Sequence, residues 1–296
     1  MVSPGVMASV RNFGDISHSS VYPTMDIGVD WYAGRKIFLS GNVKFYMDPA
    51  AASVTNPILT KLSELIWIKG NPDLKNTTEW QTGIRLLYMP LKWMSVTFST
   101  TYDNQGNASA YIYNVAGKEM GGLIKEYLNT AAIDRVSARI AVTGRFFKNA
   151  LSLTASTRWN YVNVHNELKS NCNDLVPTVK IDYVWKNFRL GVSYEGPHKN
   201  LLLGGMQFVK SKDNWTANLS YGIDNFLFKF EVRDIFHKKR ERWSMYNSNY
   251  YVSDGKEWTT GRYFVLTASY TFDYGKKVDK SIDINSPELV GTSVLH

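Results

Sequence analysis

Apolar and polar positions alternate with a period of two along much of the chain. Near the C-terminal end, Phe264, Leu266, Ala268, Tyr270 and Phe272 fall on one face, and positions 267, 269, 271 and 273 carry Thr, Ser, Thr and Asp. The same alternation recurs at residues 94–102, 151–161 and 226–233. Successive side chains of a β-strand point to opposite faces, so this pattern predicts strands with one apolar and one polar face.

The length of these runs separates two interpretations of the alternation. A soluble β-sandwich alternates too, but its strands are usually about 5 or 6 residues long, whereas tilted membrane strands need about 9 to 11. Several runs in this chain reach about 11 to 15 residues. Strand length therefore favours a membrane β-barrel over a sandwich.

Short and long connections alternate between the predicted strands. Short connections fall at residues 34–35, 90–91, 148–149, 186–187 and 224–225. Long connections span residues 48–77, 103–130, 164–175, 196–213 and 235–259. Outer-membrane barrels join their strands by short turns on the periplasmic side and by longer loops outside. The rhythm predicts an all-β fold, namely an antiparallel up-and-down transmembrane β-barrel.

Within this fold the sequence predicts about twelve strands and two short helices. The strands are expected at residues 5–13, 21–32, 36–47, 78–89, 92–102, 131–146, 150–163, 176–185, 188–195, 214–222, 226–234 and 260–274. Helices in outer loops are expected within residues 50–68, where Leu62, Leu65 and Ile66 have near-helical spacing, and within residues 120–132. Residues 1–275 are expected to form the barrel segment, and residues 276–296 a flexible tail.

Composition supports the membrane interpretation and narrows the partners. Aromatic residues make up 14% of the chain although the mean hydropathy is −0.26, as expected of a barrel with rings at two lipid interfaces and a polar lumen. No stretch of about 18 apolar residues occurs, so only a closed barrel could cross a bilayer. The net charge of +8 is scattered rather than clustered, which suits anionic lipid better than nucleic acid.

The N-terminal segment, residues 1–11, has no basic stretch followed by an apolar core. We therefore do not expect a signal peptide there. If the protein is exported, this implies either that a leader has been removed or that the chain begins within the fold. The single cysteine, Cys172, excludes an internal disulfide framework.

Four short motifs resemble elements of the Bacteroidetes-type TonB-dependent receptors. Gly-Asn-Pro-Asp-Leu-Lys at residues 70–75 resembles the Gly-Asn-Pro-x-Leu-Lys element of that family. Thr-Ala-Ser-Tyr-Thr-Phe-Asp-Tyr-Gly-Lys-Lys-Val at residues 267–278 looks like the last barrel strand, with Asp273 in place of the family's glycine. Ile-Asp-Asn-Phe at residues 223–226 and Arg-Asp-Ile-Phe at residues 233–236 are similar to late-barrel elements.

The resemblance covers residues 21–278 and implies a function as well as a fold. In this family a barrel of about twenty-two strands follows a periplasmic plug, through which TonB supplies energy. The chain looks like the C-terminal part of such a barrel, without the plug, and alone it is not expected to transport actively. The resemblance further implies the bacterial outer membrane, contact with its lipid and lipopolysaccharide, and a scarce nutrient as ligand, such as a glycan, a peptide or a metal chelate. A surface lipoprotein is a further implied partner.

No sequence feature indicates catalysis. Phosphate-binding loops, dinucleotide fingerprints, zincin helices and nucleophile elbows are absent, and the five histidines have no metal-like spacing. His165, Glu167 and Cys172 fall near one another, but in an expected exposed loop with nothing to desolvate them. We therefore expect no enzyme, no cofactor and no metal site.

Candidate binding residues come from the long loops and from the polar faces of the strands. Loop aromatic residues are expected either to stack on a ligand or to form the outer interfacial girdle: Trp67, Tyr246, Tyr250, Tyr251 and Trp258. The inward charged residues expected to line the lumen are Arg158, Lys229, Glu231 and Arg233. The basic run at residues 238–242 is expected near anionic lipopolysaccharide or at the pore mouth.

Two other functions stay open on the sequence alone. A self-contained passive porin of about twelve strands would share the alternation, and so would a soluble β-rich glycan-binding module. Discrete channels after reconstitution would indicate the porin. Partition into the aqueous phase rather than into detergent would indicate the soluble module.

Overall fold

The computed structural model describes residues 2–13, 16–116, 121–165, 170–202, 207–236, 239–247 and 251–272, and antiparallel strands dominate them. The main path of the large sheet is, in spatial order, β1 (Val2–Phe13), β2 (Ile16–Ala33), β3 (Ile37–Asp48), β6 (Thr77–Leu91), β7 (Met94–Val115), β8 (Leu123–Phe146), β9 (Leu151–His165), β10 (Asn171–Trp185), β11 (Phe188–Glu195), β14 (Asn214–Ile223), β15 (Phe226–Arg233) and β18 (Tyr263–Tyr270). Each of the twelve strands pairs antiparallel with the next. The twelve strands expected from the alternation are thereby confirmed, in their expected order.

The remaining elements belong to the long connections. β4 (Thr60–Ser63) and β5 (Ile66–Lys69) form a hairpin, and β5 pairs in parallel with the upper part of β8. A separate four-stranded sheet contains β12 (His198–Leu202), β13 (Gln207–Ser211), β16 (Lys239–Asn247) and β17 (Val252–Thr260). The helix α1 (Ala52–Thr55) has four residues. None of the helices in the described part of the chain is long and apolar enough to cross a membrane.

Four of the five short turns lie where the sequence predicts them. Gly34, Asn149, Lys186 and Asp224 have φ angles of 64°, 72°, 50° and 48°. Residues with positive φ close tight hairpins in the sense that matches the twist of the strands, and Gly, Asn and Asp adopt this conformation at the least cost. The remaining turn lies at residues 92–93, two positions beyond the expected one.

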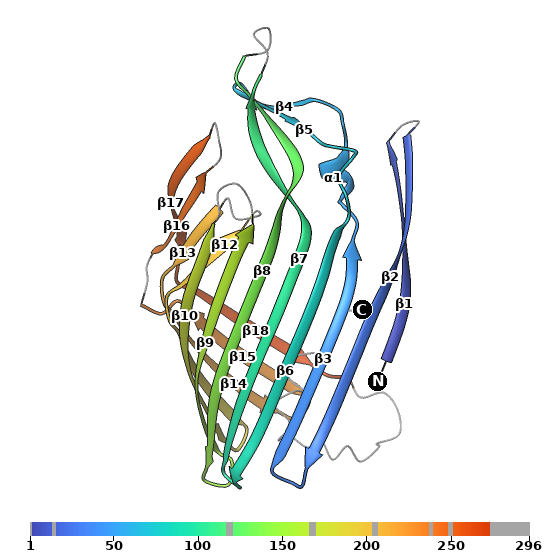
Figure 1. Ribbon diagram of the computed structural model, residues 1–296. Helices are drawn as coiled ribbons and strands as arrows, with labels where there is room; N and C mark the ends of the chain where they lie inside the picture. Colours follow the sequence, from blue (N-terminus) through green and yellow to red (C-terminus); the bar gives the residue numbers. More distant parts are fainter. Residues whose placement is uncertain are drawn as a thin grey trace.

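The register divides the large sheet into two faces of opposite chemistry. On one face Phe98 of β7 lies between Leu86 of β6 and Ile140 of β8, and exposed apolar side chains continue across the other strands. The opposite face carries polar pairs such as Arg139 with Ser156. We call the apolar face the outer wall and the polar face the inner wall. Figure 1 shows the sheet curling, so that β14, β15 and β18 pass behind β6, β7 and β8.

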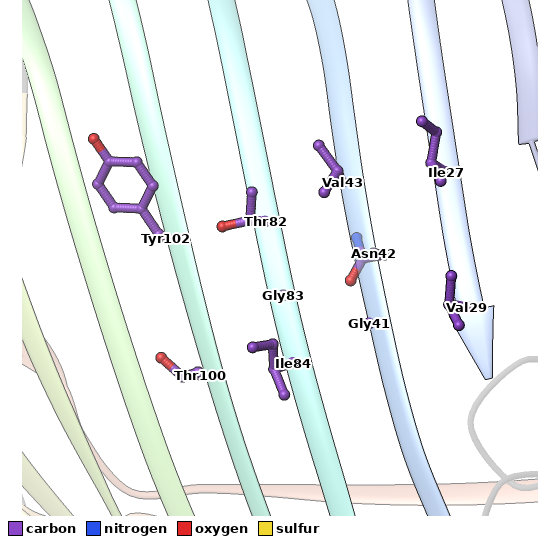
Figure 2. A pocket seen from close by; sticks show the side chains of 10 residues that line it. All are labelled: Ile27, Val29, Gly41, Asn42, Val43, Thr82, Gly83, Ile84, Thr100 and Tyr102. Atoms are coloured by element: carbon purple, nitrogen blue, oxygen red, sulfur yellow. The ribbon is translucent and has the colours of Figure 1, made fainter. Parts of the chain in front are cut away.

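A shallow hollow of about 330 Å³ interrupts the outer wall between β2 and β7 (Figure 2). It forms because Gly41 has no side chain, although its cross-strand partners are Val29 and Ile84. Ile27, Val43 and Tyr102 also border it. Its lining is largely apolar, so hydrocarbon suits it as it suits the rest of the outer wall.

The strands β7 and β8 extend well beyond a bilayer. They have 22 and 24 residues, or about 70 to 80 Å at about 3.3 Å per residue, whereas the hydrocarbon core is about 30 Å thick. The outer wall becomes polar above Tyr102, where Tyr102, Asn104 and His165 all hydrogen-bond to Asp134. The upper parts of β7 and β8 therefore belong to the outer mouth of the barrel.

Both expected loop helices are wrong, apart from the single turn α1. Residues 60–69 form the β4–β5 hairpin, so Leu62, Leu65 and Ile66 do not share a helical face. Residues 123–132 belong to β8, because they pair with β7 and bring Tyr127 beside Tyr111. Cross-strand pairing of aromatic residues outweighs local helical spacing here.

Candidate functional site

The Gly-Asn-Pro-Asp-Leu-Lys motif forms a structured clasp at the outer mouth, which we define as residues 70–75. A Cβ atom on Gly70 would lie 2.3 Å from the Asn56 carbonyl oxygen and 2.8 Å from that of Val54. The backbones meet here because the Gly70 N–H donates to Asn56 O at 2.9 Å and the Asn71 N–H to Val54 O at 2.9 Å. Only glycine allows this approach without displacement of the α1 segment.

The clasp also fastens the segment to β8. The Asn71 side-chain amide donates to the Tyr127 carbonyl at 3.1 Å. The Lys75 N–H donates to Asn129 Oδ1 at 2.7 Å, and Asn129 Nδ2 donates back to the Lys75 carbonyl at 3.2 Å. Leu74 is 4% exposed, so it anchors the clasp by burial. These contacts hold the first long connection against the second.

An aromatic cluster lies next to the clasp on the extended β7–β8 hairpin. The Lys125 ammonium lies 3.7 Å from the centre of the Tyr111 ring and 5.6 Å from that of Tyr127. The Tyr113 ring packs against that of Tyr251 with centroids 4.6 Å apart, which joins the connection between β16 and β17 to β7. Burial lowers the pKa of Lys125, and burial followed by the neighbouring tyrosines raises the pKa of Tyr111 to about 12. The ammonium is therefore held partly desolvated against ring faces.

The structure describes the side chains of three of the five loop aromatic residues that the sequence singles out, and these three lie on different elements. Tyr251 belongs to the aromatic cluster, and Trp67 lies in β5 with Lys61 5.8 Å from its ring centre. Trp258 lies in β17 and is 61% exposed. Tyr246 lies in β16 but its side chain is outside the described residues, as is Tyr250 altogether. Their role in ligand binding stays a prediction. Tyr127 was missed because residues 120–132 were expected to be helical, and Tyr111 and Tyr113 because residues 103–130 were expected to be a loop rather than an extension of β7.

All four charged residues expected in the lumen project from the inner wall. Arg158 of β9 lies 3.9 Å from Glu195 of β11. On β15, four strands further along the main path of the sheet, Arg233 contacts Glu231 and donates to the Tyr263 hydroxyl at 2.7 Å. Lys229 faces Ser220 and Thr267. The structure thus places these residues on one face but in two groups, and their part in a transport route stays a prediction.

Other inner-wall charges were not singled out from the sequence. Asp182 of β10 accepts ion pairs from Lys180 at 3.0 Å and from Arg189 at 3.5 Å. Arg135 of β8 lies 3.7 Å from Asp103 of β7. Their positions on the polar side of the alternation could have identified them, as the alternation identified Arg158.

Cys172 is not in an exposed loop, contrary to the sequence interpretation. It lies in β10, is 5% exposed and packs with Ala108, Ile133, Val164 and Leu201. Leu201 belongs to β12, so the β12–β13 hairpin covers this part of the inner wall. His165 lies apart and pairs with Asp134 at 2.6 Å, while Glu167 is outside the described residues. The three residues do not form one cluster.

Cys172 is expected to react with a maleimide at least about tenfold more slowly in the folded chain than in urea. Burial, and then the Asp174 carboxylate, raise the pKa of the thiol, so the reactive thiolate should form only at higher pH than for an ordinary cysteine. Labelling rates measured from pH 6 to 10 test this. Leu201→Ala should increase the rate, and equal rates for the folded and unfolded chains would contradict the burial.

The fold and the inner wall together define a class of protein. The chain is the wall of a transmembrane β-barrel, with an apolar outside, a charged inside and structured outer loops.

Solved structures of outer-membrane transport proteins share this fold. The copper transporter OprC is similar with a TM-score of 0.63 at 12% identity, over 86% of this chain and 40% of that one. The outer membrane transporter YddB from Escherichia coli gives 0.54 at 11% identity, over 91% and 43%. The ferric enterobactin receptor PfeA from Pseudomonas aeruginosa gives 0.56 at 12% identity, over 90% and 42%. The chain spans less than half the length of these proteins. No protein-family model and no curated protein matches the sequence.

Proposed function

We propose that this chain is the wall of a TonB-dependent receptor of the bacterial outer membrane, of the Bacteroidetes type, that takes up a scarce nutrient and catalyses no reaction. The observation that carries the proposal is the division of the sheet, along the twelve strands of its main path, into an apolar outer wall and a charged inner wall. Lipid would cover the first, and a polar solute would pass along the second. The likeness to outer-membrane transporters and the order of the four sequence motifs support it.

The extent of the sheet supports a barrel larger than twelve strands. Among the described strand pairs, β1 and β18 are the two edges of the main path and do not pair with each other. Edges of this kind are not tolerated in hydrocarbon, because their backbone groups would stay unpaired. Further strands of about ten in number, for a total of about twenty-two, would close the sheet. A plug inside that barrel would then receive energy through TonB.

Orientation in the membrane tests the proposal directly. In a Cys172→Ala background, Trp258→Cys should be labelled in intact cells by a membrane-impermeant maleimide, because β17 lies in an outer loop. Lys148→Cys, in a short turn, should be labelled only after the outer membrane is permeabilised. The proposal fails if both sites label equally in intact cells or if the protein fractionates with soluble proteins.

Conductance separates the receptor from a passive porin. The full chain reconstituted in planar bilayers is expected to give no discrete, stable channel, because the described strands leave both edges of the sheet, β1 and β18, unpaired. Stable single-channel steps of uniform size would show a barrel that closes by itself and would favour the porin. The protein must enter the detergent phase in this preparation, and recovery in the aqueous phase would favour the soluble glycan-binding module.

A further inference from the structure

A polar cavity lies on the inner wall where the β12–β13 hairpin covers the barrel strands. Its volume is about 410 Å³, within the range of about 300 to 1,000 Å³ that is usual for small-molecule sites. Strands β6 to β10 line it from one side and β12 from the other. Its lining is mostly polar, whereas the hollows on the outer wall are mostly apolar. It is also distinct from the aromatic cluster, with which it shares no lining residue.

Cations slightly outnumber anions in this cavity. Arg135, Arg158 and Lys199 line it, and so do Asp103 and Asp174. Both carboxylates already have partners, since Asp103 pairs with Arg135 at 3.7 Å and Asp174 accepts the Lys199 backbone N–H at 3.1 Å. Arg158 is held more loosely, because Glu195 lies 3.9 Å away and the Arg158 side chain is 47% exposed. Its guanidinium is therefore available for an additional anion.

Two buried polar atoms in the lining have no hydrogen-bond partner among the described residues. They are Oδ1 of Asp103 and Nδ1 of His198. A buried polar atom without a partner costs about 1 to 3 kcal/mol, so native proteins rarely leave one unsatisfied. Asp103 Oδ1 can only accept a hydrogen bond when ionised, and a neutral His198 can accept one at Nδ1. The cavity therefore offers two acceptors to hydroxyl groups of a ligand and one guanidinium to an anionic group.

These features select among kinds of ligand. An apolar molecule would bury the charges and the two unsatisfied atoms without compensation. A metal ion would need several convergent donors, and the described residues contain no group of three His, Cys, Asp or Glu side chains placed to hold one. A cationic ligand would meet the excess of basic groups. A hydroxylated molecule with one carboxylate satisfies both the guanidinium and the two acceptors.

We propose that this cavity binds an acidic sugar, with its carboxylate on Arg158 and its hydroxyl groups donating to Asp103 Oδ1 and His198 Nδ1. The inference rests on the proposed uptake function for its biological purpose, since it names the class of nutrient. Binding itself requires only the folded chain. The β12–β13 hairpin is the natural cover of the bound sugar, because His198 and Lys199 come from β12.

Titration of the full chain in detergent tests the proposal. D-Glucuronate should bind saturably, and D-glucose and D-glucosamine should bind at least about tenfold more weakly, because the carboxylate pairs with a guanidinium. Arg158→Gln and Asp103→Asn should each weaken glucuronate binding by about tenfold or more. Arg139→Gln is the matched control, because Arg139 is the cross-strand neighbour of Arg158 but does not line the cavity. It should leave the affinity unchanged within about twofold.

Cys172 supplies a second measurement, since it also lines the cavity and is the sole cysteine of the chain. Saturating glucuronate should slow its reaction with a maleimide, and glucose at the same concentration should not. The proposal is overturned if the correctly folded chain shows no saturable binding, if glucose binds equally well, or if Arg158→Gln binds as tightly as the parent chain. If glucuronate binds in detergent but the Trp258→Cys and Lys148→Cys labelling fails, the uptake function is contradicted and the sugar site is retained. If the labelling is as expected but glucuronate does not bind, the sugar site is contradicted and the uptake function is retained.

Discussion

Ile140→Arg on the outer wall is expected to destabilise the folded chain in a lipid bilayer by about 2 to 4 kcal/mol. Ile140 of β8 is 46% exposed and pairs with Phe98 on one side and Thr157 on the other. In a membrane this exposure is to hydrocarbon, which solvates a guanidinium poorly. The expected loss of stability depends on depth in the bilayer, and it is large here because Ile140 lies in the middle of the apolar part of β8.

The adjacent residue provides the control for this prediction. Ala141 faces the inner wall, where its cross-strand neighbours are Thr97 and Ser156. Ala141→Arg should therefore cost far less than Ile140→Arg, although both introduce the same side chain into the same strand. Urea titration of the protein in outer-membrane vesicles measures the two free energies of unfolding. Equal losses of unfolding free energy in the two variants would mean that both walls face the same solvent. That result would contradict the barrel assignment.

The barrel strands could be predicted from the sequence because one physical constraint acts along their whole length. Alternate side chains meet hydrocarbon and water, so the period of two persists across long strands such as β9 and β10. The tight turns follow from residues that tolerate positive φ, such as Asn149 and Asp224. These features are local in sequence, and tertiary contacts reinforce them.

The outer mouth was predicted poorly because its structure depends on contacts between distant segments. β5 pairs not only with its neighbour β4 but also with β8, 57 positions along the chain from Ile66 to Leu123, and nothing in its four residues indicates that second partner. Cys172 is buried because Leu201 covers it, although the two lie on different sheets. The polar cavity likewise combines residues from six strands. The period of the apolar alternation and the spacing of residues along the chain carry no information about contacts between distant segments.

The Gly-Asn-Pro-Asp-Leu-Lys motif has a physical role that only its contacts with other segments define. Gly70 lets two backbones meet, Asn71 bridges to β8, and Leu74 is buried beneath them. The backbone of Lys75 is also held, by two hydrogen bonds with Asn129, so four of the six positions have a structural role. The clasp fixes the β4–β5 segment over the mouth, so its integrity can be tested without knowledge of the ligand.

Gly70→Ala is expected to open the β4–β5 segment and to increase its proteolysis by at least about tenfold. The new methyl group would lie 2.3 Å and 2.7 Å from the oxygen and nitrogen of Asn56, and backbone atoms cannot rotate away as a side chain can. Overpacking of this kind costs about 1 to 3 kcal/mol, and about 1.4 kcal/mol of it suffices for a tenfold larger open population. Trypsin cleavage after Lys61 and Lys69, followed by mass spectrometry on the full chain in detergent, reports that population.

Gly28→Ala is the matched control, because a Cβ atom on Gly28 of β2 would meet nothing within 4 Å. It should leave cleavage after Lys61 and Lys69 unchanged. Asn71→Ala should reproduce part of the Gly70→Ala effect, since it removes the bond to the Tyr127 carbonyl without adding bulk. If Gly70→Ala is cleaved no faster than Gly28→Ala, the close backbone approach does not hold the segment, and the motif has no part in closing the outer mouth.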